Sequence, residues 1–536
     1  MSFLKKVQKF LEWVIGGLIS LLSLMINGDR PRARIPAIRD SLLLESGVSL
    51  ARKIRSREVT STVVVEAYIA RIKEVNGLLN AMVVERFNDA LAEARQVDEM
   101  LDSGNVPDRF SEKNAPFLGV PVSIKEAFSV KGMANTSGLV SRKDVKAPND
   151  APPVANMKRA GCIVLGLTNC SELCMWYESS NYVYGKTSNP YDIRRMVGGS
   201  SGGEGCIIGA GASVMGIGAD IGGSIRMPAF FNGVFGHKPS NDVVSNVGQF
   251  PTCEGKGNEL MVTGPICRFA ADLAPLLKVM AGPHGMAKLQ LDTHVDLRRV
   301  RYFSMGTDDR KLLVSKLDPE LRDAQLRAAR YLEEELDVQV THTSNRRFYH
   351  SISFWFEMMQ AADEESFVSL MGDHGSAVNC YVEAAKRCVG RSQHTVPAIA
   401  LGLLESLDRV IPRKSEKVLR ACQKLRNEIM TMLGDDGVLL YPTHPKMALF
   451  HNAPLLYPFN VAYTGIFNAL GLPVTQVPLG LSSNGLPLGV QVVGNRYCDH
   501  LTLAVARELE RGFGGWTAPI AASSLHGKSL GKDQGM

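Results

Sequence analysis

Two glycine- and serine-rich loops follow each other between Val197 and Ser240, and they hold the residue types with the clearest chemical potential in the chain. The first loop spans Gly198–Gly205, and the second, Asp220–Ser224, leads into a predicted helix at Ile225. Successive backbone N–H groups at the start of a helix form a nest for an anion. A nest beside a serine hydroxyl can hold the oxyanion of a tetrahedral intermediate. The segment therefore indicates anion binding or nucleophilic catalysis by serine.

Two general motifs compete for this segment. A phosphate-binding loop needs GxxxxGK[ST], or GxGxxG after a strand, and neither pattern is found here. Gly199–Gly203 formally matches the G-x-S-x-G nucleophile elbow of α/β-hydrolases. However, no strand pattern precedes it, and nothing around His444 or His451 marks either residue as the partner of a serine. Both interpretations are weak.

A third interpretation rests on several motifs together. GGSSGGE contains Ser200, DIGGSIR contains Ser224 at 24 positions further on, and Lys125 ends a predicted strand 75 positions before Ser200. In these features the chain resembles the amidase signature family. The resemblance extends to GVPVSIKE around Lys125 and to GKTSNPYD, TGPICR and GLPVTQVPLGLSSNGLPLGVQVVG, and it covers roughly residues 40 to 515.

The resemblance implies a Ser–cis-Ser–Lys catalytic set. Ser224 matches the nucleophile, Ser200 the bridging serine that follows a cis peptide bond, and Lys125 the base. Ser201 matches a supporting serine beside the bridge. The oxyanion hole corresponds to four backbone N–H groups, those of Ile221, Gly222, Gly223 and Ser224. The resemblance implies neither a cofactor nor a metal ion.

This set suits amide cleavage on chemical grounds. A serine hydroxyl is a weak nucleophile and needs a base. Lysine can serve only as the neutral amine, a form that burial favours, and Lys125 follows an apolar stretch. A free amide ion is too basic to leave, so the departing amine must be protonated. We therefore expect Ser200 to carry a proton from Ser224 to Lys125 and later to the leaving amine.

Within the family, the chain looks most like the fatty-acid amide hydrolases, in particular their second animal type. This likeness implies cleavage of long-chain fatty-acid amides, such as N-acylethanolamines and primary fatty amides, to fatty acid and amine. Cys174, Met175 and Trp176 would lie near the acyl-binding pocket. Residues 394–412 correspond to a membrane-facing cap or, equally, to an ordinary amphipathic helix. The alternatives are an amidase of small amides, a glutamyl-tRNA amidotransferase-like amidase subunit, and a non-catalytic binding protein.

Helical and strand patterns alternate along the chain, which predicts an α/β fold with a large mixed, twisted sheet covered by helices on both faces. A helix is expected after a cap at Ser61 or Thr62, and residues 342–413 are expected to form a helical insertion over the core. The other predicted elements are strands at 117–124, 162–167, 439–441 and 488–493 and helices at 319–336 and 501–511.

The composition is that of a packed globular protein. Of 536 residues, 45% are hydrophobic and 21% charged, which excludes a disordered chain and a multi-span transporter. The net charge of +6 is small for this length and no long basic run is present, so we expect no nucleic-acid partner. Ten cysteines do not make a disulfide scaffold in so long a chain, and no spacing resembles a zinc site.

The first thirty residues differ from the rest of the chain. Lys5, Lys6 and Lys9 precede Val14–Ile26, a run of 13 residues without a charge. We interpret residues 1–28 as an uncleaved anchor on an intracellular membrane, although a signal peptide or a helix docked on the core would share this pattern. The linker 29–39, the amidase signature domain 40–515 and the tail 516–536 would follow. The expected partners are a lipid-like amide substrate and a membrane, and a homodimer is left open.

Overall fold

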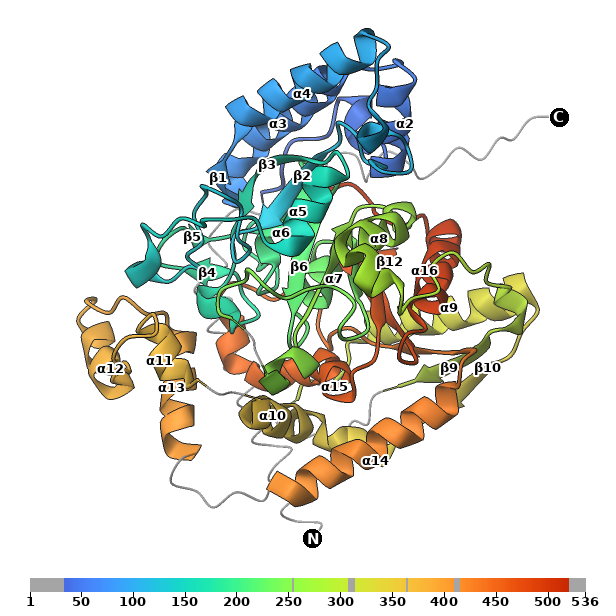
Figure 1. Cartoon of the computed structure of the whole chain (residues 1–536). Helices are drawn as coiled ribbons and strands as arrows, with labels where there is room; N and C mark the ends of the chain where they lie inside the picture. The colour runs from blue at the N-terminus through green and yellow to red at the C-terminus, as the bar shows by residue number, and fades with distance from the viewer. Residues whose placement is uncertain (1–32, 253–254, 307–313, 363–364, 409–414, 520–536) are drawn as a thin grey trace, which may run out of the picture.

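An eleven-stranded mixed sheet runs through the molecule (Figure 1). It is seen in a computed structural model that describes residues 33–252, 255–306, 314–362, 365–408 and 415–519. The strands lie in the order β1-β3-β2-β6-β8-β7-β12-β13-β11-β9-β10. In chain order they are β1 Met82–Glu85, β2 Pro121–Lys125, β3 Ile163–Thr168, β6 Met215–Asp220, β7 Phe235–Lys238, β8 Val262–Cys267, β9 Arg301–Met305, β10 Val340–Thr343, β11 Gly437–Tyr441, β12 Val474–Leu481 and β13 Pro487–Gly494, while β4 Ser180–Asn181 pairs separately with β5 Gly185–Lys186.

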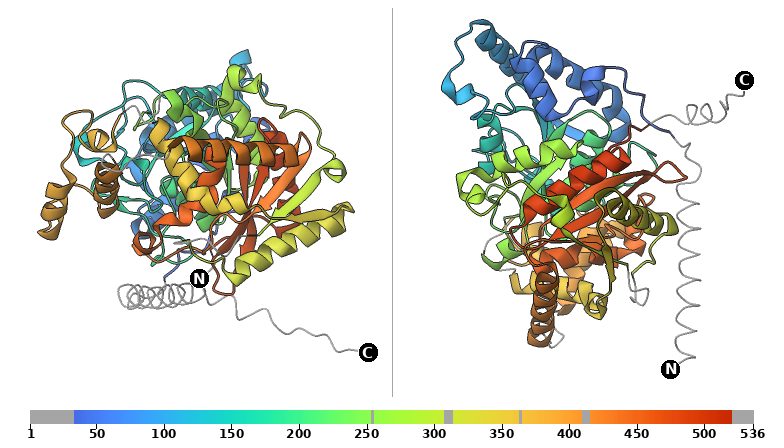
Figure 2. Two further views of the ribbon diagram at one scale, coloured as in Figure 1. Left: turned by 90° about the horizontal axis from the view of Figure 1, so that it is seen from below. Right: turned by 90° about the vertical axis from the view of Figure 1, so that its right-hand side faces the viewer.

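Helices surround this sheet, which confirms the predicted α/β architecture (Figures 1 and 2). They are α2 Gly47–Arg55, α3 Ser61–Leu79, α4 Phe87–Asp102, α5 Pro152–Arg159, α6 Gly202–Gly209, α7 Arg226–Phe231, α8 Ala270–Met286, α9 Pro319–Leu336, α10 Ser351–Ala362, α11 Phe367–Met371, α12 Cys380–Cys388, α13 Val396–Asp408, α14 Ser415–Leu433, α15 Ala462–Leu470 and α16 Asp499–Phe513.

Three neighbouring strands, β3, β2 and β6, run parallel to one another. Their residues are fully buried, as expected for strands enclosed on both faces. The carboxyl ends of parallel strands meet at one edge of a sheet, so the last residues of these strands, Thr168, Lys125 and Asp220, share that edge. Both glycine-rich loops also start there, since α6 follows the first loop and β6 leads into the second.

Most predicted elements form close to where they were expected, and the differences have local causes. Strand β2 begins at Pro121 rather than at residue 117, because Gly119 has a φ of +79°, which is incompatible with a strand. Helix α3 is capped by Thr60, whose hydroxyl accepts the amide of Val63. The predicted cap Ser61 is instead the first helical residue, and its hydroxyl donates to the carbonyl of Gly119.

The predicted insertion at 342–413 is helical and consists chiefly of α10 to α13. Helix α10 packs against α15 beside the central sheet. Helices α11 to α13 form a group at one side of the molecule in Figure 1 and in the left view of Figure 2. Their apolar side chains pack on Leu139, Leu173 and Phe250 in a cluster separate from the main core. The insertion therefore covers the core only in part.

The predicted membrane anchor, and the intracellular membrane location inferred from it, are wrong. Among the residues that the structure describes, no helix combines the length and the apolar character needed to cross a bilayer. The prediction relied on a run of only 13 uncharged residues, shorter than the ~20 that a spanning helix needs. Residues 1–28, to which it referred, lie outside the described ranges. The domain boundaries at 28, 39 and 515 stay a prediction.

Candidate active site

Lys125 and Ser200 meet at the carboxyl edge of the parallel strands. Lys125 is fully buried at the end of β2, and its Nζ donates a hydrogen bond to Ser200 Oγ at 2.8 Å. The peptide bond between Gly199 and Ser200 is cis, as the family resemblance implied. Gly199 leaves no room for a side chain, since a Cβ would lie 2.5 Å from the carbonyl oxygen of Trp176. The backbone thus places the Ser200 hydroxyl on a buried amine.

Ser201 joins the two glycine-rich loops. Its hydroxyl donates to the carbonyl of Ala219 and accepts the amide of the same residue, at 3.3 and 3.4 Å. Its own amide donates to the carbonyl of Ser224 at 3.3 Å. These contacts hold the Ser200 loop against the Ser224 turn. The supporting role that the resemblance implied for Ser201 stays a prediction.

Ser224 lies at the end of the second loop and is only 8% exposed. Among the described residues, no hydrogen bond joins its hydroxyl to that of Ser200. Catalytic hydrogen bonds are often long before substrate binds and tighten in the complex. The structure therefore brings the three predicted catalytic residues, Lys125, Ser200 and Ser224, to one site, with the contact between Lys125 and Ser200 already made.

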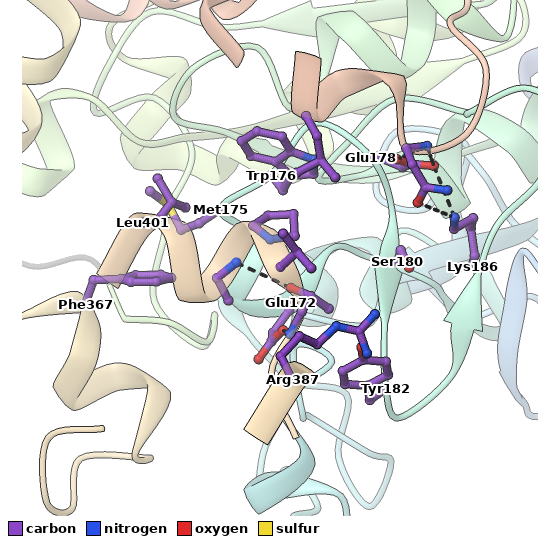
Figure 3. Close-up of a pocket in the computed structure, with 16 residues that line it drawn as sticks. Glu172, Met175, Trp176, Glu178, Ser180, Tyr182, Lys186, Phe367, Arg387 and Leu401 are labelled. Carbon is purple, nitrogen blue, oxygen red and sulfur yellow. Dashed lines mark hydrogen bonds and ion pairs between the residues drawn. The ribbon is translucent and has the colours of Figure 1, made fainter. Parts of the chain in front are cut away.

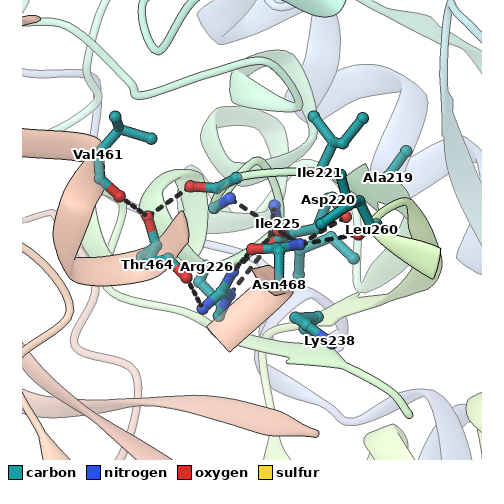
Figure 4. A network of polar contacts seen from close by, with 12 residues as sticks. Ala219, Asp220, Ile221, Ile225, Arg226, Lys238, Leu260, Val461, Thr464 and Asn468 are labelled. Atoms are coloured by element: carbon teal, nitrogen blue, oxygen red, sulfur yellow. Dashed lines mark hydrogen bonds and ion pairs between the residues drawn. The ribbon is translucent and has the colours of Figure 1, made fainter. Parts of the chain in front are cut away.

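A buried carboxylate shapes the turn that carries Ser224 (Figure 4). Asp220 accepts the amides of Gly223 and Ile225 at 2.7 and 3.1 Å, and it pairs with Arg226 at 2.9 Å. Neither side chain of this pair is exposed. Burial alone would raise the pKa of Asp220, but Arg226 and a hydrogen bond from Asn468 hold that pKa well below its usual range. The carboxylate is therefore ionised and fixes the turn from within.

Two further donors hold the carbonyl groups of this turn. Thr464 Oγ1 donates to the carbonyl of Gly222 at 2.6 Å, and the indole Nε1 of Trp355 donates to the carbonyl of Ile221 at 2.8 Å. Of the four amides predicted to form the oxyanion hole, that of Gly223 is already used by Asp220. No described residue accepts a hydrogen bond from the amides of Gly222 and Ser224, which are thus free to meet a substrate oxygen.

Glu204 on α6 has no assigned role in the sequence analysis, although it belongs to the GGSSGGE motif. It is completely buried and accepts hydrogen bonds from Ser123 and Thr168, both at 2.8 Å. Burial raises the pKa of this carboxyl to about 8. At pH values below this pKa the carboxyl is protonated, and it ties α6 to strands β2 and β3 through Ser123 and Thr168. The position of Glu204 at the end of the GGSSGGE motif is the sequence signal that could have pointed to this residue.

Cys174 lies at the Lys125–Ser200 contact rather than along the cavity described next. The interactions that set the pKa of its thiol involve Cys170, Lys125 and Ser200. The hydrogen bond with Cys170 and the charge of Lys125 lower the pKa of the Cys174 thiol, although burial opposes this. Part of its surface stays exposed. The sequence analysis had placed Cys174 only near the acyl-binding pocket and had not linked it to Lys125 or Ser200.

Met175 and Trp176 line a cavity of about 240 Å³ (Figure 3). One wall comes from their own loop and from β4 and β5, and the opposite wall comes from α11 and α13. Glu172 joins the walls, because it accepts the amide of Thr395 and pairs with His394, both at 2.7 Å. The remaining lining is mixed apolar and charged and includes Phe367, Leu401, Leu455, Lys186, Arg387 and Glu178.

The two histidines of the nucleophile-elbow hypothesis have other partners. His451 is held by Glu178 at 2.8 Å through Nδ1 and by the carbonyl of Ile193 at 3.2 Å through Nε2. His444 is buried, which lowers its pKa to about 3, and its Nδ1 faces the carbonyl of Lys446. Residues 187–201 contain no strand that could lead into Ser201, so the structure gives that hypothesis no support.

Comparison with known proteins agrees with this geometry. The protein-family model for amidases matches residues 63–503. The chain belongs to the amidase family. It is 50% identical to human fatty-acid amide hydrolase 2 over 527 residues, which cover 97% of this chain and 99% of the relative. Zebrafish (Danio rerio) fatty-acid amide hydrolase 2-B is 51% identical, with 96% and 98% covered.

Solved structures support the fold. The structure of a fatty acid amide hydrolase superposes with a TM-score of 0.69 at 20% identity and covers 88% of this chain and 86% of that one. At this identity the likeness shows the architecture alone. Together with the family match, it confirms the predicted amidase fold.

Proposed function

We propose that this chain is a serine amidase that cleaves long-chain fatty-acid amides to a fatty acid and an amine. The contact between the buried Lys125 amine and Ser200 Oγ, beside Ser224, carries the amidase chemistry. The substrate class rests on the identity of about half of all positions to fatty-acid amide hydrolase 2 along nearly the whole of both chains. The site thus supports the amidase chemistry, and the similarity to fatty-acid amide hydrolase 2 supports the substrate class.

In the proposed reaction, Ser224 attacks the amide carbonyl while its proton passes through Ser200 to the amine of Lys125. The developing oxyanion lies against the amides of Gly222 and Ser224, and preorganised donors of this kind are worth roughly 3–4 kcal/mol each in other hydrolases. The proton then returns through Ser200 to the leaving amine. Water then attacks the acyl-enzyme. Its proton passes through Ser200 to Lys125 and then to Ser224 Oγ, which leaves as the fatty acid is released.

The apolar residues near the turn support an acyl-binding role. Met175 packs against a cluster formed by Leu260, Trp355 and Met359, and Ile221 of the turn belongs to the same surroundings. An acyl chain whose carbonyl lies at Ser224 would therefore contact apolar side chains. The expected substrates are N-acylethanolamines and primary fatty amides, and a homodimer stays a prediction.

A substrate series tests this function. Purified full-length protein is assayed with primary amides from C6 to C18, with acetamide and with glutamine. Each CH₂ buried in an apolar site can improve kcat/KM by at most about fourfold, since its transfer is worth ~0.8 kcal/mol. We expect kcat/KM to rise with chain length and then level off. A flat series, or a preference for acetamide or glutamine, would exclude the fatty-amide substrate and leave an amidase of small amides or an amidotransferase-like subunit.

A further inference from the structure

Trp355 makes an unusual contact for a residue of the helical insertion. It lies on α10, its side chain is largely buried, and it reaches across to the turn that carries Ser224. Its Nε1 donates to the carbonyl of Ile221 at 2.8 Å. None of the motifs in the sequence pointed to this residue, and the catalytic relay does not include it.

The indole ring also sets the spacing around the turn. It lies between two glycines, Gly222 on the turn and Gly465 on α15. A Cβ at either position would come within 3.1 Å of the ring, closer than nearly all real contacts. The ring therefore replaces the missing side chains and packs directly on the backbone of the turn. Loss of the ring would remove this packing from both backbones.

The hydrogen bond to Ile221 has a directional consequence. The peptide bond between Ile221 and Gly222 is trans, so its N–H points away from its C=O. Fixing the carbonyl of Ile221 toward Trp355 therefore aims the amide of Gly222 to the opposite side. Thr464 fixes the next carbonyl, that of Gly222, in the same manner. The amide of Gly222 has no partner among the described residues and is one of the predicted oxyanion donors.

We propose that Trp355 is a positioning residue for amide cleavage, and that its indole N–H and ring hold the Gly222 amide in the direction of the substrate oxyanion. This inference rests on the proposed function, because it requires a tetrahedral intermediate on Ser224. Trp355 touches neither the relay nor the reacting atoms and acts only through the Ile221–Gly222 peptide. The insertion thereby contributes to transition-state stabilisation.

The test compares Trp355→Phe, which keeps an aromatic ring but lacks the donor, with Phe356→Leu as a matched control. Phe356 is the next residue of α10 and packs on the same apolar cluster, but it donates no hydrogen bond to the turn. Active sites are counted with a fluorophosphonate so that kcat refers to competent enzyme. The readouts are kcat and KM for an amide and the matching ester, and the affinity for an acyl trifluoromethyl ketone, which forms a tetrahedral oxyanion adduct.

We expect kcat of Trp355→Phe to fall by at least about 10-fold, but by less than the roughly 10²–10³-fold that loss of a whole oxyanion donor costs. KM should change little, the amide and the ester should lose the same factor, and the ketone should bind more weakly by that factor. Phe356→Leu keeps the indole donor to Ile221, so it should change kcat and the affinity for the ketone far less than Trp355→Phe does.

Three results would overturn the proposal. They are an unchanged kcat per titrated site, a loss confined to KM, and a reduced kcat with unchanged affinity for the ketone. If Trp355→Phe does not fold, β-(3-benzothienyl)alanine at position 355 keeps the ring shape without the N–H, and the same three results apply. Failure of the proposed function is separate, since it would appear in the wild type as absent amide turnover.

Discussion

The glycine-rich segment 197–240 and the helical insertion 351–408 serve the same site in different ways. Nearly every residue of the first segment is buried in the sheet, and it carries Ser200 and Ser224 on backbone turns that admit no side chain. The insertion contacts the site from outside, through Trp355 on the turn and through α13 on the cavity wall. The chemistry thus depends on backbone geometry, whereas the surroundings of the substrate depend on side-chain packing.

This difference predicts how sensitive each region is to substitution. A turn that needs glycine at fixed positions leaves a specific pattern in the sequence and tolerates few changes. Many different sequences can form a helix that needs only an apolar face. Substitutions in the first region should therefore abolish reaction steps, and those in the second should alter rates or local stability by smaller amounts. The following predictions, in order of decreasing effect, begin with Lys125, which contacts Ser200 of the first region, and end on a helix of the insertion.

The largest effect is expected for Lys125→Ala. General bases of this kind contribute about 10²–10⁴-fold, so amide turnover at neutral pH should fall by that order. Ester turnover should fall less, because an alkoxide leaves without the proton that Ser200 returns to an amine. Rate profiles for an amide and its matching ester between neutral and high pH provide the measurement. Loss of the same constant factor for both substrates at every pH would contradict the relay.

Alkylation of Cys174 should also inactivate the enzyme. Its thiolate displaces iodide from iodoacetamide and forms a thioether, which places a bulky group on the Lys125–Ser200 contact. Cys388 on α12 is exposed and gives the control, since Cys388→Ala should be inactivated at the wild-type rate. Residual activity is compared with the extent of labelling at each cysteine by peptide mapping. Full labelling of Cys174 with activity retained, or inactivation that follows Cys388, would reject this position for the thiol.

Glu204 should make the fold more stable at lower pH. Its pKa rises from about 4.5 to about 8 on burial, so between these values the folded state binds a proton that the unfolded state releases. The free energy of unfolding should therefore fall as pH rises through this window, by up to about 1.4 kcal/mol per pH unit from this group. Glu126 and Asp272, with pKa values raised by burial to about 7 and about 6, act in the same direction.

The matched variant is Glu204→Gln, which keeps the shape and stays neutral. Denaturant unfolding from pH 5 to pH 8 should show a shallower decline for the variant than for the wild type, with the two proteins nearly equal at pH 5. Equal slopes across the range would mean that Glu204 is not a neutral acid in the folded protein.

The smallest effect is expected at an exposed position of α13, and a buried position of the same helix provides the contrast. Leu404 is 53% exposed, so Leu404→Ser should change stability by no more than about 0.5 kcal/mol. Ile399 is buried in the cluster with Leu139 and Leu173, and Ile399→Ala should cost about 2–5 kcal/mol. Hydrogen exchange of the α13 amides reports this local stability. Protection lost equally in both variants would show that α13 does not pack as described.

The same contrast explains what could be predicted from the sequence. The positions of Lys125, Ser200 and Ser224 were predictable, because close backbone approach forces glycine and small residues into a specific order. The strands β2, β3 and β13 were predictable from short buried apolar runs. Thr60 was missed as the cap of α3, because three hydroxyl residues in succession could each serve.

Other features depend on contacts that no local pattern records. Trp355 reaches Ile221 over 134 positions of sequence, and Asp220 takes up the amide of Gly223 that was predicted to face substrate. The supposed membrane anchor shows the opposite error, since a short apolar run was given a function that its length does not support. Tertiary packing, rather than local propensity, decided the contacts of Trp355 and Asp220.

The acylated residue is the most direct test of the account. The full-length enzyme is mixed with a fluorophosphonate, or quenched in acid during turnover of a long-chain ester, and the peptides are mapped by mass spectrometry. The account predicts the adduct on Ser224, and its loss from Ser224→Ala. An adduct on Ser200 or Ser201, or amide turnover by Ser224→Ala at the wild-type rate, would contradict it.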